Sequence, residues 1–577
     1  MNAATSAERR SFWLFALLAV CVLGAGIGLR DPWPADEPRF ALAARQMVQG
    51  GDWLFPHRGS ELYADKPPLF MNLQAAAFEL VRNWRIAFLL PSLLATLGTL
   101  ILVYDLGRRL WNRRTGLTAA WLTLFAVGFT FQARRAQIDP AVVFFITLAN
   151  YGLLRHLLRG PDWRQWALGG FAAGLGVITK GVGIIALLCL PPWLWIRRRQ
   201  PAAHGDLRFA GGRRWLLAPA LCVFAVALWL VPMLLAVHAQ HDPAYAAYAD
   251  NILFRQTAQR YLAAWHHEQP PWYYFEVIAL QWLPLSLFLP WLVRPWWRAL
   301  RDGDARHAVL LGFVVLVLVF FSLSAGKREV YILPALPMLA LVAAPHVPMI
   351  LGATKWPARW LWALCLLLAL MALGIGAYAD WISPEWGARQ LVAHAFDAGA
   401  AQVWIWFAAF GTAGILACAL LGPARPLRSC TVVLTAFWAC VGFGVQPALN
   451  DASSARGLMR AVGARLGVQG ELGLVAWKEQ NLLMADRPAT DFGFSKPWRE
   501  QLSAAIAWQA AAPALRWILL PGTALDPCIR RGRALDIGES NRIDWWLFRA
   551  DAVDPTCRGG KLPEASRPRV VATGDGG

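Results

Sequence analysis

The sequence predicts a polytopic α-helical membrane protein that ends in a small α/β domain. Of its 577 residues, 57% are hydrophobic and only 16% are charged, which is more apolar surface than a water-soluble fold can bury. Apolar stretches of roughly 18 to 20 residues, the length that crosses a bilayer as a helix, recur through the first 447 positions. By this length rule we expect about thirteen transmembrane helices.

The first apolar stretch covers residues 12–29 and follows two basic residues, Arg9 and Arg10. A secretory signal would be followed by a small-residue cleavage site, whereas an acidic loop follows here. We therefore expect a retained anchor rather than a cleaved leader.

The formal net charge is +19, which in a soluble chain would suggest nucleic-acid binding. Here the arginines gather in alternate loops, around 108–114, 155–164, 197–214, 294–306 and 425–428. The positive-inside rule places such loops, and the N-terminus, in the cytoplasm. The loops 30–83 and 238–272, and everything after about residue 447, should then face outward.

The expected outward domain covers residues 448–577. Its sequence predicts helices over 455–466 and 497–511, and short strands over 472–477, 515–520 and 545–548. Residues 558–577 lack apolar periodicity and should form a frayed tail. Of nine cysteines, seven lie in or beside apolar spans, whereas Cys528 and Cys557 lie in this domain, where a disulfide could form.

The first outward loop is the most informative segment. Asp36 precedes an amphipathic stretch over 40–48 that could lie as a short helix on the membrane surface. Further on, Lys66 stands directly before Pro67 and Pro68, which restrict the backbone. A lysine held in this way suits a phosphate group, although single charges in such loops are more often only solvated or interfacial.

The order of these motifs is more specific than any one of them. Asp-Glu-Pro-Arg-Phe from Asp36, Gly-Asp-Trp-Leu-Phe-Pro-His from Gly51 and Tyr-Ala-Asp-Lys-Pro-Pro-Leu from Tyr63 resemble the first periplasmic loop of the lipid A aminoarabinose transferases. These enzymes belong to the GT-C glycosyltransferases that use polyprenyl-phosphate sugars. The resemblance continues at 134–140, at 179–181 and at 324–334, and departs from the typical pattern at Pro38 and Asp65.

The resemblance implies a GT-C fold in the bacterial inner membrane, with residues 1–447 as the transferase domain and 448–577 as a periplasmic domain. It implies transfer of 4-amino-4-deoxy-L-arabinose from undecaprenyl phosphate to a lipid A phosphate. The added aminosugar would lower the negative charge of the cell surface, and the resemblance therefore implies resistance to polymyxin and other cationic peptides. The sugar and the acceptor stay open, because the related protein O-mannosyltransferases act on hydroxyl groups.

Candidate site residues follow from this chemistry. Negative charge develops on the departing phosphate, so positioned cations stabilise the transition state. Lys66 is the first candidate, and Asp36 and Asp139 are the candidate carboxylates, acting either as base or as orienting groups. The remaining candidates could bind phosphate or substrate: Tyr63, Arg39, Arg135, Lys180, Arg255, Arg260, Lys327, Arg328 and Tyr331.

We expect no required metal or nucleotide cofactor, because the chain has no recognised zinc spacing and no phosphate-binding glycine loop. A structural metal in the outward loops stays open. The expected partners are the lipid-linked donor, lipid A and membrane lipids, but no nucleic acid. Two other classes compete with the transferase: a transporter of lipid-linked sugars, which would carry polar groups at mid-span, and a membrane scaffold, which leaves the loop motifs unexplained.

Overall fold

The computed structural model describes residues 6–199, 211–254 and 268–557, apart from 325, 395 and 397. The chain forms two compact units. The first contains residues 1–57 and 62–450, and the second contains 58–61 and 451–577.

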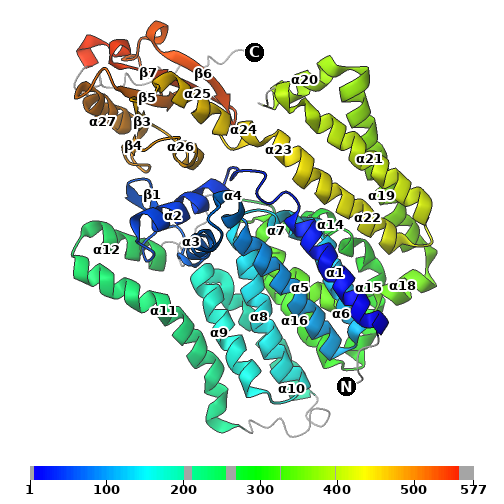
Figure 1. The fold of residues 1–577 in the computed structure, drawn as a ribbon. Coiled ribbons are helices and arrows are strands. Elements are labelled where there is room, and N and C mark those ends of the chain that lie inside the picture. The colour runs from blue at the N-terminus through cyan, green and yellow to red at the C-terminus, as the bar shows by residue number, and fades with distance from the viewer. Residues whose placement is uncertain are drawn as a thin grey trace, which may run out of the picture. The chain divides into compact units, whose positions relative to one another are not determined.

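The described residues of the first unit are predominantly helical (Figure 1). A short hairpin of β1 (His57–Arg58) and β2 (Glu61–Leu62) in the first loop contributes residues to both units. Its main helices are α1 (Ser6–Gly24), α2 (Glu37–Gly50), α3 (Leu69–Val81), α5 (Leu90–Leu110), α6 (Arg113–Phe125), α7 (Val127–Ala133), α8 (Ile138–Arg159), α9 (Trp163–Thr179), α10 (Leu190–Arg199), α11 (Leu217–Gln240), α12 (Pro243–Asp250), α14 (Tyr273–Gln281), α15 (Leu285–Arg301), α16 (Ala305–Ser322), α17 (Leu336–Ala343), α19 (Lys355–Ala377), α20 (Pro384–Ala393), α21 (Gln402–Leu421) and α22 (Pro426–Cys440).

Eight helical segments among the described residues are long and apolar enough to cross a membrane, and eleven if three bent helix pairs each count as one span. The sequence suggested about thirteen. The numbers differ in part because apolar stretches that read as single spans are broken, as between α6 and α7, where the axis bends by 71°. The sequence-based prediction and the structure agree on a membrane protein with many helical spans.

The amphipathic helix predicted in the first loop is confirmed as α2. It has Asp36 as its N-cap residue and Pro38 in its first turn, where a missing N–H costs no helical hydrogen bond. Gly51 ends the helix in the left-handed conformation, with φ at 76°. The apolar residues Phe40 and Met47 are at most 3% exposed, so this helix packs against its own unit through that face.

The second unit contains a five-stranded sheet in the order β4-β3-β5-β7-β6. Strands β3 (Glu471–Leu474), β4 (Ala489–Asp491) and β5 (Arg516–Pro521) are parallel, and β7 (Ile543–Phe548) pairs antiparallel with β5 and with β6 (Leu535–Ser540). Its helices are α25 (Arg456–Leu466), α26 (Glu479–Met484) and α27 (Trp498–Ala510). Both predicted helices and all three predicted strands are present, and their ends differ from the predicted ones by at most three residues.

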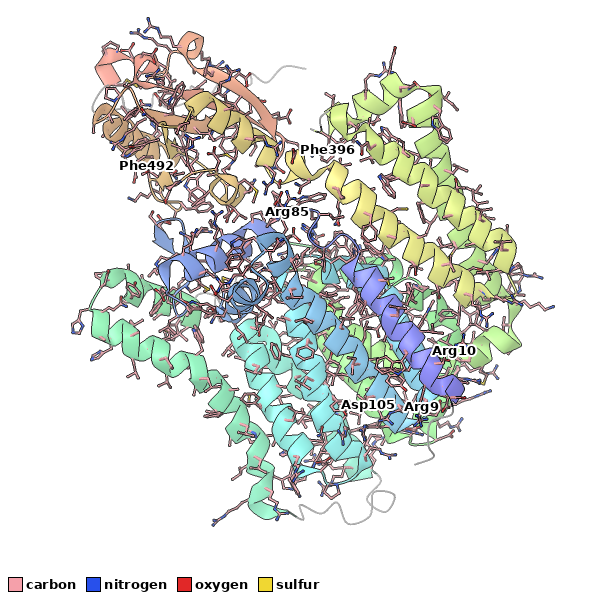
Figure 2. All side chains as sticks on the ribbon, viewed as in Figure 1. Arg9, Arg10, Arg85, Asp105, Phe396 and Phe492 are labelled. Carbon is pink, nitrogen blue, oxygen red and sulfur yellow. A yellow bond between two sulfur atoms is a disulfide. The ribbon has the colours of Figure 1, made fainter. Side chains whose placement is uncertain are left out.

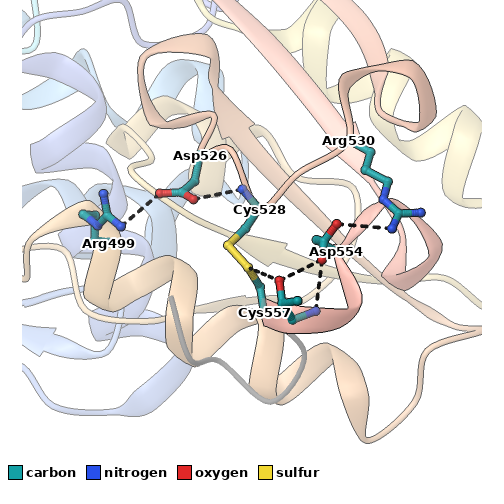
Figure 3. Close-up of a disulfide and its surroundings, with 7 residues drawn as sticks. Arg499, Asp526, Cys528, Arg530, Asp554 and Cys557 are labelled. Carbon is teal, nitrogen blue, oxygen red and sulfur yellow. Dashed lines mark hydrogen bonds and ion pairs between the residues drawn. A yellow bond between two sulfur atoms is a disulfide. The ribbon is translucent and has the colours of Figure 1, made fainter. Parts of the chain in front are cut away.

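Cys528 and Cys557 form a disulfide, with their Cα atoms 6.0 Å apart (Figure 3). Beside it, Asp526 accepts a hydrogen bond from the Cys528 N–H at 3.0 Å and lies 3.3 Å from Arg499. The predicted tail over 558–577 lies outside the described residues.

Four residues of the first outward loop, 58–61, belong to the second unit rather than to the first. The Asp491 carboxylate accepts two hydrogen bonds from Ser60, from its N–H at 3.0 Å and from its hydroxyl at 2.7 Å. Glu61 accepts a hydrogen bond from the Ser495 N–H at 3.0 Å. A division made by position along the chain could not include these residues, because their membership depends on contacts more than 430 positions away.

Candidate active site

Four charged residues lie at helix ends in the first unit. Asp36 caps α2, Asp139 lies in the first turn of α8, Lys180 follows the last residue of α9, and Arg328 precedes the 3₁₀ helix η4 (Glu329–Ala335). Carboxylates at helix N-termini and a cation at a helix C-terminus complement the helix dipoles. The ends of four helical segments thus supply the charges of the site.

Lys180 and Asp139 form a tight ion pair. The Lys180 Nζ lies 2.6 Å from Asp139 Oδ1, and the two side chains are 15% and 10% exposed. The same ammonium lies 5.2 Å from the centre of the Tyr331 ring, a distance at which a cation is attracted to the aromatic face. A lysine held by a carboxylate and a ring has little freedom to turn away.

Asp36 is shared by two arginines. Its carboxylate lies 3.6 Å from Arg328 and 3.4 Å from Arg39. Burial lowers the pKa of Arg328, but the carboxylates of Asp36 and Asp139 outweigh it and raise that pKa above its ordinary value. The negative charges of both carboxylates therefore stabilise the charged form of Arg328. We call Asp36, Arg39, Asp139, Lys180, Arg328 and Tyr331 the ion-pair cluster.

The position of Lys180 depends on a close contact between the backbones of α9 and the segment that follows it. After Lys180 the chain turns into the 3₁₀ helix η1 (Gly181–Cys189), and a Cβ atom at Gly183 would lie 2.1 Å from the carbonyl carbon of Gly176 in α9. Only glycine permits this contact. The two segments can therefore fold back on each other with Lys180 at the apex.

Glu37 is a site-supporting residue that the sequence did not single out. It is fully buried and accepts two hydrogen bonds from Arg30 at 2.6 and 2.7 Å, one from the Trp33 N–H and one from the Ala136 N–H, both at 2.8 Å. Burial raises the pKa of Glu37, but Arg30, the Trp33 N–H and the charge of Arg135 lower it below its ordinary value. Glu37 thereby joins the loop that carries Asp36 to the loop that leads to Asp139.

A second hydrogen-bond network, around Asp31, fixes the start of the same loop. Arg85 donates two hydrogen bonds to Asp31, both at 3.0 Å, and Asn450 donates a third at 2.8 Å. Figure 2 labels Arg85. The only sequence signal was a pair of acidic positions, Asp31 and Glu37, in a loop where solvated acids are common.

The other predicted residues lie as follows. The Lys66 ammonium donates to the Asp65 carbonyl at 3.1 Å, and Tyr63 is only 1% exposed. Lys327 is buried and donates to the Gln269 carbonyl at 3.1 Å. Arg135 lies 3.4 Å from the Pro34 carbonyl. Two predicted residues, Arg255 and Arg260, lie outside the described residues.

Among the described residues, no group of three or more His, Cys, Asp or Glu side chains is placed to hold a metal ion. The ion-pair cluster instead offers three cations beside two carboxylates. Such an arrangement can bind phosphate oxygens and, because its members hold one another, presents them in a preorganised geometry.

Comparison with known proteins agrees with this chemistry. The sequence model of the dolichyl-phosphate-mannose-protein mannosyltransferases matches residues 65–206. The undecaprenyl phosphate-α-4-amino-4-deoxy-L-arabinose arabinosyl transferase of Pseudomonas aeruginosa PAO1 is 30% identical over 504 residues, which cover 82% of this chain and 85% of the relative. The enzyme of the same name from Pectobacterium carotovorum is 31% identical over 63% of this chain and 64% of its own.

The fold has a solved counterpart. The crystal structure of ArnT from Cupriavidus metallidurans, bound to undecaprenyl phosphate, has a TM-score of 0.73 to this chain, with 17% identity, and the match covers 94% of this chain and 99% of that one. The protein is thus a membrane glycosyltransferase of the GT-C fold. Within this class, the chain belongs to the family of the undecaprenyl phosphate-aminoarabinose arabinosyl transferases.

Proposed function

We propose that this enzyme transfers 4-amino-4-deoxy-L-arabinose from undecaprenyl phosphate to a phosphate group of lipid A at the periplasmic face of the inner membrane. The single observation that carries the proposal is the ion-pair cluster, in which Lys180 and Arg328 are held by Asp139 and Asp36. Family membership supports the donor, because the relatives are named for it.

In the proposed reaction, an oxygen of the lipid A phosphate attacks the anomeric carbon of the sugar. The bond from that carbon to the donor phosphate oxygen breaks, and undecaprenyl phosphate leaves with the electron pair. Lys180 and Arg328 stabilise the charge that grows on the leaving phosphate. The acceptor phosphate is already ionised near neutral pH, so Asp139 and Asp36 orient these cations rather than remove a proton.

In this proposal Arg39, within the ion-pair cluster, and Lys66 and Arg135, in the outward loops, supply further positive charge for the substrate phosphates. Lys327 and Tyr63 support the surrounding loops, and Tyr331 helps to hold Lys180. Arg255 and Arg260, outside the described residues, stay candidates for phosphate binding from the sequence alone. The N-terminus is cytoplasmic and the C-terminal unit periplasmic, as the alternate arginine-rich loops indicate. A positively charged sugar on lipid A would weaken the attraction of polymyxin and other cationic peptides.

Mass spectrometry of lipid A tests the proposal. Cells that lack their own aminoarabinose transferase would express this chain, its Lys180→Ala, Asp36→Ala and Lys66→Ala variants, and a control, Arg10→Gln, far from the cluster. We expect an added aminopentose with the parent chain and the control, and loss of it with the three variants. Unmodified lipid A in cells with normal amounts of the parent chain in the membrane would reject the lipid A acceptor.

One observation favours a second acceptor. Residues 65–206, which include Asp139 and Lys180, match the protein mannosyltransferase model, and a protein hydroxyl would need a base. In that case Asp36 or Asp139 would accept the proton. The same cells would then show a glycosylated membrane or periplasmic protein and unmodified lipid A.

A further inference from the structure

A cavity of about 540 Å³ lies far from the ion-pair cluster, at the opposite end of the helices. It is formed by the start of α1, the end of α5, the start of α6, the end of α8 and the start of α9. Along α8 alone, Arg155 in this cavity is separated from Asp139 by sixteen residues, or about 24 Å of helix. We call it the basic cavity, and nothing in the proposed transfer reaction uses it.

One end of the basic cavity is strongly charged. Its lining contains four arginines and two acids, Arg9, Arg108, Arg113, Arg155, Glu8 and Asp105. The positive charges therefore exceed the negative ones by two, at the arginine-rich loops that the positive-inside rule assigns to the cytoplasm. An anion that entered the cavity would meet a positive field.

The two acids of the lining do not neutralise all four arginines, and Arg155 pairs with Asp162 at 3.3 Å, outside the lining. Glu8 pairs with Arg113 at 2.9 Å, and Asp105 holds Arg108 and accepts a hydrogen bond from Tyr151 at 2.7 Å. Within the part of the chain that the structure describes, Arg9 has no ion-pair partner. Its guanidinium has five N–H donors, so it can bind phosphate in a bidentate way.

The other end of the basic cavity is lined by exposed apolar side chains. Trp13 and Ile101 line it and are 69% and 57% exposed. Ile101 lies seven residues before Arg108 on α5, which is about 10 Å deeper along the helix. The cavity thus passes from cations to exposed apolar side chains within the depth of a lipid headgroup and its first acyl carbons.

We propose that the basic cavity is a binding site for an anionic phospholipid of the surrounding leaflet. The phosphate lies against Arg9 and Arg113, and an acyl chain lies over Trp13 and Ile101. A free phosphate would satisfy only the charged end and would leave the apolar end exposed to lipid. Basic pockets between transmembrane helices on the cytoplasmic side are suited to such headgroups. Figure 2 labels Arg9, Arg10 and Asp105 at this end of the helices.

The test uses the purified full-length protein in detergent and measures bound lipid by native mass spectrometry. The probes are phosphatidylglycerol, phosphatidylcholine with the same acyl chains, and inorganic phosphate. The variants are Arg9→Gln and the matched control Arg10→Gln, which removes the neighbouring charge on the same helix but does not line the cavity. An Arg9→Lys variant keeps the charge, and elution volume and melting temperature verify folding.

We expect the parent chain to retain phosphatidylglycerol in preference to phosphatidylcholine. Arg9→Gln should weaken phosphatidylglycerol binding about fivefold, Arg10→Gln should leave it unchanged, and Arg9→Lys should restore most of it. Equal weakening by Arg9→Gln and Arg10→Gln would show a non-specific charge effect and overturn the proposal. Equal retention of phosphatidylcholine, or full displacement of the lipid by millimolar phosphate, would also overturn it.

Discussion

At the scale of single residues, the cations of the site depend on their partners. Lys180 and Arg328 each lie beside a carboxylate, at 2.6 and 3.6 Å. The helix dipoles favour Asp36, Asp139 and Lys180 at the ends of α2, α8 and α9, whereas Arg328 precedes the first residue of η4 and depends on its carboxylate partner. A cation fixed before the substrate arrives loses little freedom in the transition state. This is why the arrangement of the pairs matters more than the number of basic residues in the chain.

Replacement of Lys180 tests this view. Lys180→Met keeps the length of the side chain and removes its charge, so we expect turnover in a reconstituted transfer assay to fall at least about 100-fold, as for the loss of one stabilising donor. Lys355→Met removes an exposed lysine at the start of α19 and should have no effect. Equal activity of Lys180→Met and the parent chain would exclude Lys180 from phosphate stabilisation.

Glu37 gives a prediction about stability. Glu37→Ala would leave the buried Arg30 without its charge partner, and such a loss costs about 3 to 5 kcal/mol. The variant should therefore melt well below the parent chain in detergent. Glu79→Ala, which removes an exposed ion pair with Arg82, is the control and should melt within a degree or two of the parent. Similar melting of both variants would show that the Glu37 network does not hold the loops.

The same residue gives a pH dependence. Because the folded-state pKa of Glu37 lies below its ordinary value of 4.5, its stabilisation is complete above pH 4.5 and is lost as the pH falls through the lower, folded-state pKa. Melting temperatures of the parent chain and of Glu37→Gln should therefore differ most above pH 4.5 and converge below it. A difference that grows in acid would contradict the lowered pKa.

At the scale of elements, the short segment after α9 decides where Lys180 lies. Gly183→Ala would place a methyl group against the Gly176 backbone and force η1 away from α9. We expect strongly reduced transferase activity with the protein still present in the membrane. Gly374→Ala, in α19 with open space around it, should be fully active. Normal activity of Gly183→Ala would show that the loop can shift without displacing Lys180.

Within the C-terminal unit, Asp491 holds residues 58–61 through Ser60. Asp491→Ala should loosen this segment, because its two hydrogen bonds to Ser60 are lost. Limited trypsin digestion should then cleave faster after Arg58 than in the parent chain. Asp544→Ala, at an exposed position of β7, is the control. Equal cleavage rates in both variants would mean that other contacts hold the segment.

Patterns along the chain predicted some elements and missed others for a physical reason. Strands β3, β5 and β7 have buried apolar residues, whereas β4 is only three residues long and β6 is mostly exposed, so neither carries a clear alternation. Helix α2 was predictable because its apolar face repeats at helical spacing. The 3₁₀ helix η1 was not, because a continuous apolar run does not distinguish a 3₁₀ segment from an ordinary span.

At the scale of the whole molecule, the arginine-rich loops predict the membrane orientation. A phosphatase that is active only in the periplasm should be active when it is fused after residue 557 and inactive when it is fused after residue 199. A second reporter, one that is active only in the cytoplasm, should be active when it is fused after residue 199. The physical reason is that loops rich in Arg are retained on the cytoplasmic side. A periplasmic signal from the fusion after residue 199 would reverse the assignment, including the leaflet proposed for the basic cavity.

The sequence by itself determined the class of protein, because membrane spans, arginine asymmetry and an ordered set of loop motifs are properties of composition and local order. It also pointed to Asp36, Asp139, Lys180 and Arg328. Only the tertiary structure decided that Asp139 pairs with Lys180 and Asp36 with Arg328, that Glu37 joins two loops and that residues 58–61 belong to the C-terminal unit. These are contacts between distant segments, and their partners depend on how the helices pack rather than on any pattern within one segment.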